Sequence, residues 1–89
     1  MRFAWDRRKA DLNARKHRVT FEEAVTVFAD PLALMIEDES HPENGRIIGE
    51  SAATRVLLVV FVEREHDLLR LISARRATPH ERRRYEEGE

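Results

Sequence analysis

The clearest pattern of hydrophobic and polar positions lies in the stretch Thr20–Phe28, which predicts a helix packed on a sheet. Its apolar residues recur at intervals of three and four, as on one side of a helix: Phe21, Ala24, Val25 and Phe28. Thr20 and Glu23 fit a capping box, in which each side chain satisfies a backbone amide of the first turn. Pro31 predicts the end of this element, because the residue before a proline disfavours helix.

Two further helices are predicted near the ends of the chain. The stretch Arg7–Lys16 is rich in helix formers and lacks Gly and Pro, and Asp6 is suited to cap its first turn. Its weak apolar side consists of Ala10, Leu12 and Ala14. A last helix begins after Thr78, with Pro79 in its first position and Glu81 completing a second capping box.

The remaining apolar stretches predict five strands, although the short run Leu32–Ile36 fits a helix as well. The predicted strands are Arg2–Trp5, Leu32–Ile36, Arg46–Glu50, Arg55–Glu63 and Leu68–Ala74. Asn44–Gly45 is a strong turn signal between two of them. Four successive strands with short connections must pair largely antiparallel, because a parallel pair needs a long crossover. The pattern therefore predicts an α+β fold, with two N-terminal helices packed on a mostly antiparallel sheet and a C-terminal helix.

Length and composition limit the class of protein. A chain of 89 residues suits one domain, residues 1–89, whose modest core would gain stability from a bound partner. The lack of cysteine excludes disulfides and thiolate chemistry and favours a reducing cytoplasm. Residues 1–9 hold no secretory signal, and the longest apolar run, Val56–Val62, is too short to span a bilayer. We therefore expect a cytoplasmic protein without membrane contact.

Charge is divided unevenly along the chain, although the formal net charge is only -1. Residues 1–20 hold seven basic and two acidic residues, for a net charge of +5. Residues 21–54 hold one basic and eight acidic residues, for a net charge of −7. Residues 64–84 hold seven basic and three acidic residues, for a net charge of +4. If the two basic segments meet in space, they form the patch that binds nucleic acid. Solvated helix faces explain the same charges, and charge alone favours that simpler interpretation.

Familiar metal, nucleotide and nucleophile motifs are absent from the sequence. The four histidines are scattered, and none pairs with another at the spacing of metal ligands. An acidic turn at residues 38–43 can hold a hard cation, but a solvated loop explains it better. The glycines form no phosphate-binding loop, and no serine lies in a nucleophile elbow. We expect neither a metal nor a cofactor.

Arginines towards the C-terminus are the remaining candidates for chemistry. Arginine suits phosphate recognition because its planar, permanently charged fork donates two parallel hydrogen bonds. Arg70 lies on the last predicted strand, and Arg75 and Arg76 follow that strand directly. Adjacent residues of an extended segment point to opposite sides, so at most one of Arg75 and Arg76 should face a given phosphate. Arg82–Arg84 follow on the last helix, where a solvated surface is the alternative for at least one of them.

The last helix also brings pairs of polar residues onto common sides. His80 and Arg84 stand four residues apart, as do Glu81 and Tyr85. Capping is the main role expected of Glu81. For His17, near the end of an earlier helix, a favourable contact with the helix dipole is expected rather than catalysis.

Three groups of motifs are spread over essentially the whole chain. The first group is Phe3-x-Trp5-Asp6, Lys9, Asn13 and Lys16-His17-x-Val19-Thr20-Phe21-Glu22-Glu23-Ala24. The middle group is Phe28-x-Asp30-Pro31 and Arg46-x-x-Gly49. The last group is Arg70-x-Ile72-Ser73-Ala74-Arg75-x-Ala77, Glu81 and Tyr85. The first and last groups are specific when they occur together, and the three groups resemble the motifs of the BrnT toxins.

The resemblance implies a RelE-like fold, a ribonuclease that stops translation, and an antitoxin encoded beside it. In that family the antitoxin is a dimeric DNA-binding protein that represses the operon with the toxin bound. The expected partners are therefore the antitoxin, RNA (free or on the ribosome), and operator DNA through the antitoxin alone. The alternative is a non-catalytic module that binds protein or nucleic acid through the same arginines.

The mechanism implied for such a toxin is attack by the neighbouring 2′-hydroxyl of RNA on the phosphate, without a metal. This reaction needs positive charge at the phosphorane, a base for the hydroxyl and an acid for the leaving oxygen. The charge candidates are Arg70, Arg75 and Arg76, with Arg75 favoured because it belongs to the last motif. The proton-transfer candidates are His80, Tyr85 and Lys9. The RNA-binding candidates are Lys9, Lys16, Arg46, Arg83 and Arg84.

Overall fold

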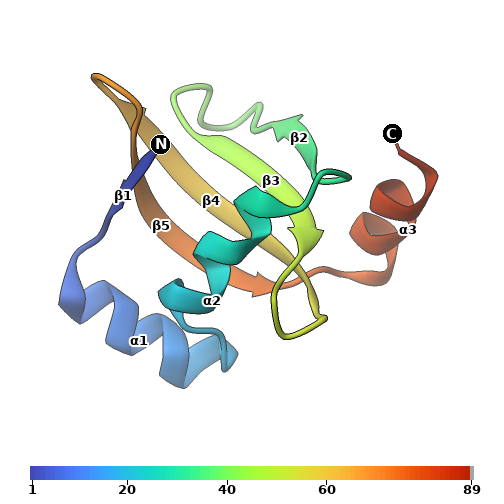
Figure 1. Ribbon diagram of the computed structural model, residues 1–89, viewed down its shortest axis with the longest axis horizontal. Helices are drawn as coiled ribbons and strands as arrows, with labels where there is room; N and C mark the ends of the chain where they lie inside the picture. Colours follow the sequence, from blue (N-terminus) through green and yellow to red (C-terminus); the bar gives the residue numbers. More distant parts are fainter. Residues whose placement is uncertain (89) are drawn as a thin grey trace.

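The structure is a computed structural model that describes residues 1–88. These residues form one five-stranded sheet with strand order β1-β5-β4-β3-β2, accompanied by three α-helices (Figure 1). The elements are β1 (Arg2–Ala4), α1 (Arg7–His17), α2 (Phe21–Val25), the 3-10 helix η1 (Thr26–Ala29), β2 (Leu34–Glu37), β3 (Gly45–Glu50), β4 (Val56–Arg64), β5 (Leu68–Arg76) and α3 (Pro79–Glu87). No helix within residues 1–88 is long and apolar enough to cross a membrane.

The sheet is antiparallel except at one edge. Strands β2 to β5 pair antiparallel in sequence order, and β1 pairs parallel with β5, with Phe3 opposite Leu69. Short loops join the four antiparallel strands, as their spacing along the chain predicts. The predicted α+β fold, with its mostly antiparallel sheet, two N-terminal helices and C-terminal helix, is confirmed.

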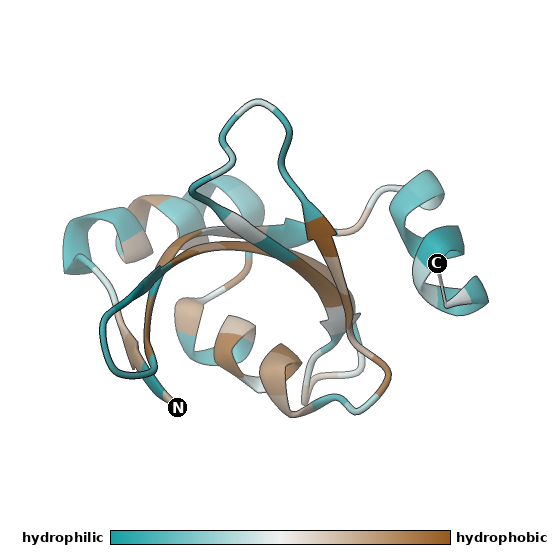
Figure 2. Ribbon diagram, turned by 90° about the horizontal axis from the view of Figure 1, so that it is seen from above, coloured by the Kyte–Doolittle hydropathy of each residue, from teal (hydrophilic) through white to brown (hydrophobic). Residues whose placement is uncertain are grey.

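The sheet is curved, and α2 lies in its hollow (Figure 2). We call this side of the sheet the inner face and the opposite side the outer face. Phe21 and Ala24 of α2 and Val27 of η1 are fully buried against the inner face. The sheet contributes Ile47, Leu57, Val59, Phe61, Leu69, Leu71 and Ala74 to the same core. The helix α1 lies beside β5 and contacts α2, and α3 packs near β3.

Asn13 of α1 covers the edge of β5 beyond the short strand β1. Its Nδ2 donates to the carbonyl oxygens of Ala74 at 2.8 Å and Val19 at 2.9 Å, and its Oδ1 accepts from the Ala74 N–H at 3.0 Å. A buried side-chain amide thus takes the place of a neighbouring strand. The same helix leaves Leu12 55% exposed, so the apolar side predicted for it is wrong at that position.

Each α-helix begins at the capping residue that the sequence predicts, but the capping box predicted for α2 is incomplete. Asp6 accepts a hydrogen bond from the Lys9 N–H at 3.1 Å, and the predicted capping box of α3 is complete. At α2, Thr20 Oγ1 accepts a hydrogen bond from the Glu23 N–H at 3.0 Å. The full capping box predicted there is wrong, because the Glu23 side chain does not accept the Thr20 N–H in return. The Glu23 carboxylate binds Arg55 instead, because a half-buried guanidinium is available there. The predicted helix also tightens into η1 after Val25, which brings Val27 into the core.

Two strand boundaries differ from the prediction by two residues, and the others differ by at most one. β5 continues to Arg76, so Arg75 and Arg76 lie within the strand and not after it. The two added residues belong to the strand because β4 extends far enough to pair with them. β2 begins only at Leu34, and the preceding Leu32 is 72% exposed.

The Asn44–Gly45 step does not form the expected tight hairpin. Residues 38–44 make a longer loop, and Gly45 is already the first residue of β3. A side chain at Gly45 would overlap the ring of Phe61 on the neighbouring strand. Glycine is therefore required here by the close approach of an aromatic ring and not by a turn.

An irregularity in β5 determines which side chains face the core. Ile72 is an extra residue with no direct partner on β4. As a result, the core residues Leu71 and Ala74 are three positions apart instead of two. Beyond this bulge Arg76 pairs across from an inner-face residue, and Arg75 points to the outer face. The expectation that the two arginines point to opposite sides agrees with this register.

Candidate functional site

Two arginines and a glutamate meet where α3 packs on the outer face. Glu81 of α3 binds Arg75 of β5 through two hydrogen bonds, from Nη1 to Oε1 at 2.9 Å and from Nη2 to Oε2 at 3.0 Å. A guanidinium nitrogen of Arg46 on β3 lies 3.8 Å from Glu81 Oε2. We call Arg46, Arg75 and Glu81 the arginine cluster. It joins three elements that are far apart in the sequence.

The position of Glu81 follows from the start of α3. Glu81 is the third residue of the helix, and its Oε1 also accepts the Thr78 N–H at 2.9 Å, closing the capping box. Burial of the Glu81 carboxyl opposes its ionisation, but the hydrogen bonds from Arg75 and Thr78 outweigh burial and lower its pKa. The expected capping role is therefore confirmed, and the same carboxylate also holds Arg75.

Arg46 keeps unused donors at this cluster. Its Nε is buried and makes no hydrogen bond to any group within residues 1–88. Two guanidinium groups stand against one carboxylate, so the arginine cluster carries a net positive charge. A buried, unsatisfied N–H beside excess positive charge favours an incoming anion.

Tyr85 connects the same helix to the segment before β2. Its hydroxyl donates to Asp30 Oδ2 at 2.6 Å. Asp30 Oδ2 also accepts the Glu50 N–H at 2.8 Å, and Asp30 Oδ1 accepts the Leu32 N–H at 2.9 Å. The hydrogen bond to the Asp30 carboxylate is the largest of the effects that raise the pKa of Tyr85 to about 12. Tyr85 therefore keeps its proton at neutral pH.

The structure brings some of the predicted site residues together and separates others. Arg46, Arg75 and Tyr85 gather around α3, and Arg70 shares the outer face. Arg76 lies on the opposite face, where its charge helps to lower the pKa of Glu23, after larger effects led by the hydrogen bond from Arg55. The other predicted residues are exposed on helices, except for the half-buried Arg84: His80, Arg83 and Arg84 on α3, and Lys9 and Lys16 on α1.

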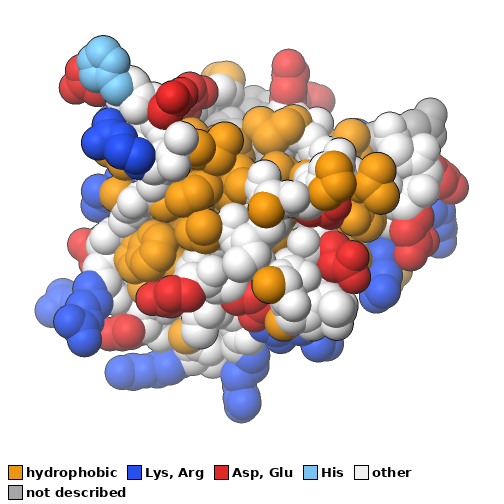
Figure 3. Space-filling view, in the orientation of Figure 1, with side chains coloured by type: hydrophobic (Ala, Val, Ile, Leu, Met, Phe, Trp, Pro, Cys, Tyr) orange, Lys and Arg blue, Asp and Glu red, His pale blue; other side chains and the backbone are white. Residues whose placement is uncertain are grey.

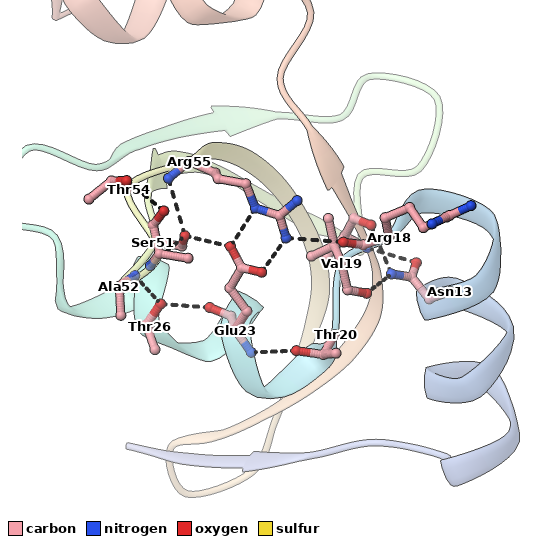
Figure 4. A network of polar contacts seen from close by, with 12 residues as sticks. Asn13, Arg18, Val19, Thr20, Glu23, Thr26, Ser51, Ala52, Thr54 and Arg55 are labelled. Atoms are coloured by element: carbon pink, nitrogen blue, oxygen red, sulfur yellow. Dashed lines mark hydrogen bonds and ion pairs between the residues drawn. The ribbon is translucent and has the colours of Figure 1, made fainter.

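Near the start of α2 a second polar network has a structural role that the sequence did not indicate (Figure 4). The Arg55 guanidinium donates to Glu23 Oε2 at 2.9 Å and to the Arg18 carbonyl at 3.0 Å, and the Ser51 hydroxyl donates to Glu23 at 2.6 Å. The hydrogen bond from Arg55 is the main cause of the lowered pKa of Glu23. This network ties the loop between β3 and β4 to α2 and to the end of α1.

Asp30 is the main member of the site that sequence reasoning missed. The only available signal was its place in the Phe28-x-Asp30-Pro31 motif, where it was interpreted as the end of a helix. Its side chain binds the backbone of Leu32 and Glu50 and the hydroxyl of Tyr85, 55 residues away in the sequence. Such a long-range partner cannot be recognised from local spacing.

The acidic turn considered as a cation site is organised by its own first residue. Asp38 Oδ1 accepts the N–H groups of Ser40 at 3.1 Å and His41 at 3.3 Å. Among residues 1–88, no three His, Asp or Glu side chains come together as metal ligands would.

Comparisons with known proteins identify the relatives of the chain. Residues 5–81 match a family model described as the ribonuclease toxin BrnT of type II toxin–antitoxin systems. The structure is similar to the crystal structure of the Brucella abortus ribonuclease toxin BrnT, with a TM-score of 0.71 and 24% sequence identity. That similarity covers 88% of this chain and 97% of the Brucella chain, and it shows a shared fold. No curated protein matches the sequence.

Proposed function

This chain belongs to the BrnT family of ribonuclease toxins of type II toxin–antitoxin systems, and on that premise we propose that it cleaves RNA at the arginine cluster. The family gives the activity and an antitoxin partner, and it favours the ribonuclease over a non-catalytic binding module. The position of the site is our inference. The observation that carries it is the meeting of Arg46 and Arg75 on Glu81, from three separate elements.

The cluster suits an RNA phosphate because it offers charge and fixed donors together. Glu81 holds the Arg75 guanidinium in one orientation through two hydrogen bonds. Arg46 contributes an N–H without an acceptor among residues 1–88. A pre-oriented cation stabilises a phosphorane better than a mobile one, because it need not reorganise during the reaction.

In the proposed reaction the 2′-oxygen forms a bond to phosphorus and the bond from phosphorus to the 5′-oxygen breaks. A base takes the proton of the 2′-hydroxyl, and an acid supplies one to the departing 5′-oxygen. The products are a 2′,3′-cyclic phosphate and a 5′-hydroxyl. Arg75 and Arg46 stabilise the negative charge on the phosphorane, and no metal takes part.

Proton transfer is assigned to two residues of α3. Tyr85 keeps its proton at neutral pH, so we assign it as the acid and not as the base. Its hydroxyl donates to Asp30 Oδ2 in the free protein and must turn to the departing 5′-oxygen when RNA binds. The departing alkoxide is a stronger base than tyrosinate, so the transfer from Tyr85 is favourable. His80 lies next to Glu81 in the first turn of α3 and is open to solvent, and histidine is the side chain that most often serves as a general base. We therefore assign His80 as the base.

The remaining basic residues extend this site into a surface for RNA. Arg70 lies on the outer face close enough to Asp6 to contribute to the lowered pKa of that carboxyl, after the larger effect of the Lys9 amide. Further cations would bind backbone phosphates and position the strand. These are the exposed Lys9, Lys16 and Arg83 and the half-buried Arg84.

The family also suggests how the toxin is controlled. We propose that its antitoxin is a dimeric DNA-binding protein that represses the operon with the toxin bound, so that operator DNA meets the toxin only through the antitoxin. RNA is cleaved free or on the ribosome, in the cytoplasm. Induced expression should then stop translation, and co-expression of the antitoxin should restore it.

The proposal is tested by incubating the purified toxin with RNA and analysing the ends of the fragments. We expect 2′,3′-cyclic phosphate and 5′-hydroxyl ends, formed equally well with a chelator present. Arg46→Ala should lower the rate about tenfold or more, because it removes charge from the phosphorane. Cleavage that needs a divalent ion, or that leaves 5′-phosphate ends, would contradict the mechanism.

A further inference from the structure

The inner face carries an apolar groove whose lining meets the proposed RNA site at Asp30, the residue that binds Tyr85. Two adjoining hollows lie there, with volumes of about 700 and about 260 Å³, and they share Met1 and Phe28 as walls. The larger is lined by Phe3, Val25 and the start of the loop after β3. The smaller is lined by Met35 of β2 and by the core residues Ile47, Phe61 and Leu69. We call the two together the inner groove.

The inner groove leaves hydrophobic side chains open to solvent. Met35 is 59% exposed, and Phe3 and Phe28, whose ring centroids lie 5.1 Å apart, are only half-buried. Figure 3 shows apolar side chains gathered on this face over the strands beside α2. A contiguous apolar surface of this kind in a small protein marks a place where another chain binds.

The charge around the inner groove is opposite to that of the arginine cluster. The acidic residues Asp30, Glu50, Glu63 and Asp67 line the hollows. The Asp30 carboxylate already binds Tyr85, which leaves Glu50, Glu63 and Asp67 to meet a partner. Within residues 1–88, no Lys, Arg or His is among the side chains that line either hollow. In Figure 3 the Lys and Arg side chains stand towards the margins of the view. Carboxylates repel RNA phosphates, so this face selects a partner with positive charge.

We propose that the inner groove binds a segment of the antitoxin whose apolar side chains fill the two hollows and whose Lys or Arg side chains meet the carboxylates. The inference rests on the antitoxin partnership given by the family and does not depend on where RNA is cleaved. The groove and the arginine cluster lie on opposite faces of the sheet. The segment in the groove therefore anchors the antitoxin and leaves the inhibition of cleavage to contacts elsewhere.

The test compares two variants that change the net charge equally. The groove variant, Met35→Arg with Glu63→Lys, places two cations on exposed positions of the inner groove. The control variant, Leu12→Arg with Glu22→Lys, makes the same exchange at exposed positions outside it. Each is titrated calorimetrically with the antitoxin encoded by the reading frame beside the toxin gene, and folding is checked by circular dichroism.

The groove variant should bind the antitoxin at least about tenfold more weakly than the wild type, because it buries like charges together and removes an apolar contact. The control variant should bind within about twofold, as expected for exposed residues outside an interface. Should the groove variant fail to fold, the single change Met35→Ser serves instead and should still weaken binding measurably. Wild-type-like binding by the folded groove variants overturns the proposal.

RNA cleavage by the free toxin separates this inference from the proposed RNA site. The groove variant should cleave RNA at the wild-type rate. If it loses cleavage while folded, the groove serves RNA and the antitoxin proposal is wrong. If Arg46→Ala cleaves normally while the groove variant loses antitoxin binding, the RNA site is wrong and the groove proposal stands.

Discussion

Asn13 binds both backbone groups of Ala74, so a single side chain on α1 completes the edge of β5. The amide donates to the carbonyl oxygen and accepts from the N–H, as a neighbouring strand would do. The two residues are 61 positions apart in the sequence. This contact fixes α1 beside β5, at the residue directly before Arg75 of the arginine cluster.

Removing the Asn13 amide should therefore destabilise the whole fold. Asn13→Ala leaves buried N–H and C=O groups of Ala74 without partners, at an expected cost of about 2–4 kcal/mol in the free energy of unfolding. Urea unfolding followed by circular dichroism measures this change. The neighbouring variant Leu12→Ala is the control and should change the free energy by less than about 0.5 kcal/mol, because Leu12 is largely exposed. Equal stability of the two variants would show that the edge contact is unimportant.

Arg75 is predicted to be needed for RNA cleavage. Arg75→Ala removes the fixed guanidinium and should lower the cleavage rate roughly a hundredfold. Arg75→Lys keeps the charge but loses the paired hydrogen bonds to Glu81, and it should recover only part of the rate. Arg82→Ala is the control, since Arg82 is an exposed helix residue paired with Glu86. Full activity of a folded Arg75→Ala protein would remove Arg75 from the site.

Tyr85 should titrate at unusually high pH. It is the only tyrosine of the chain, so the ultraviolet absorbance of tyrosinate reports on it alone. We expect a pKa of about 12, which should fall towards 10 in Asp30→Asn because the acceptor carboxylate is lost. A midpoint near 10 in the wild type would mean that the hydrogen bond to Asp30 does not form in solution.

The same shift predicts how stability depends on alkaline pH. The folded-state pKa of Tyr85 lies above the unfolded value, so its contribution is complete below about pH 10 and is lost as the pH rises towards 12. Tyr85→Phe should therefore show a flatter decline of melting temperature over this interval than the wild type. Parallel declines in the two proteins would contradict this prediction.

On the acid side, Glu23 should control part of the loss of stability. Its hydrogen bond with Arg55 lowers its pKa in the folded state, so the unfolded chain binds more protons as the pH falls. Its contribution is present above the unfolded pKa of about 4.3 and is lost as the pH falls through the lower folded value. Glu23→Gln should thus be less stable at neutral pH and flatter between roughly pH 3 and pH 5. Exposed Glu22→Gln is the control and should keep the wild-type profile.

The parts of the fold that could be predicted from sequence depend on neighbouring residues. Asp6 and Thr78 cap helices through amides only three positions away, so their spacing alone identifies them. The antiparallel order of β2 to β5 follows from short connections. By contrast, Glu23 has the spacing of a capping residue but binds Arg55, because a guanidinium 32 residues away competes for its carboxylate. Spacing cannot reveal such a competitor.

The candidate site shows the same division. The motifs of the resemblance include Arg46, Arg75 and Tyr85, which do lie around α3. Arg76 was a candidate only because it follows the predicted strand, and it faces away. The predicted strand ended at Ala74, so the faces of the residues after it could not be assigned from a strand register. Asp30 was missed because all its partners except Leu32 are distant in sequence.

The extra residue at Ile72 determines which arginine of β5 faces Glu81. If the same sequence paired regularly with β4, without a bulge at Ile72, strict alternation after Leu71 would exchange the faces of the two neighbouring guanidinium groups. Arg75 would then turn towards the hydrophobic core, and Arg76 would be the one to reach Glu81. Relatives without the bulge must therefore carry the corresponding arginine one position earlier or later along the strand. For this strand to keep its role, the spacing between Leu71 and Arg75 must be preserved as well as the arginine itself.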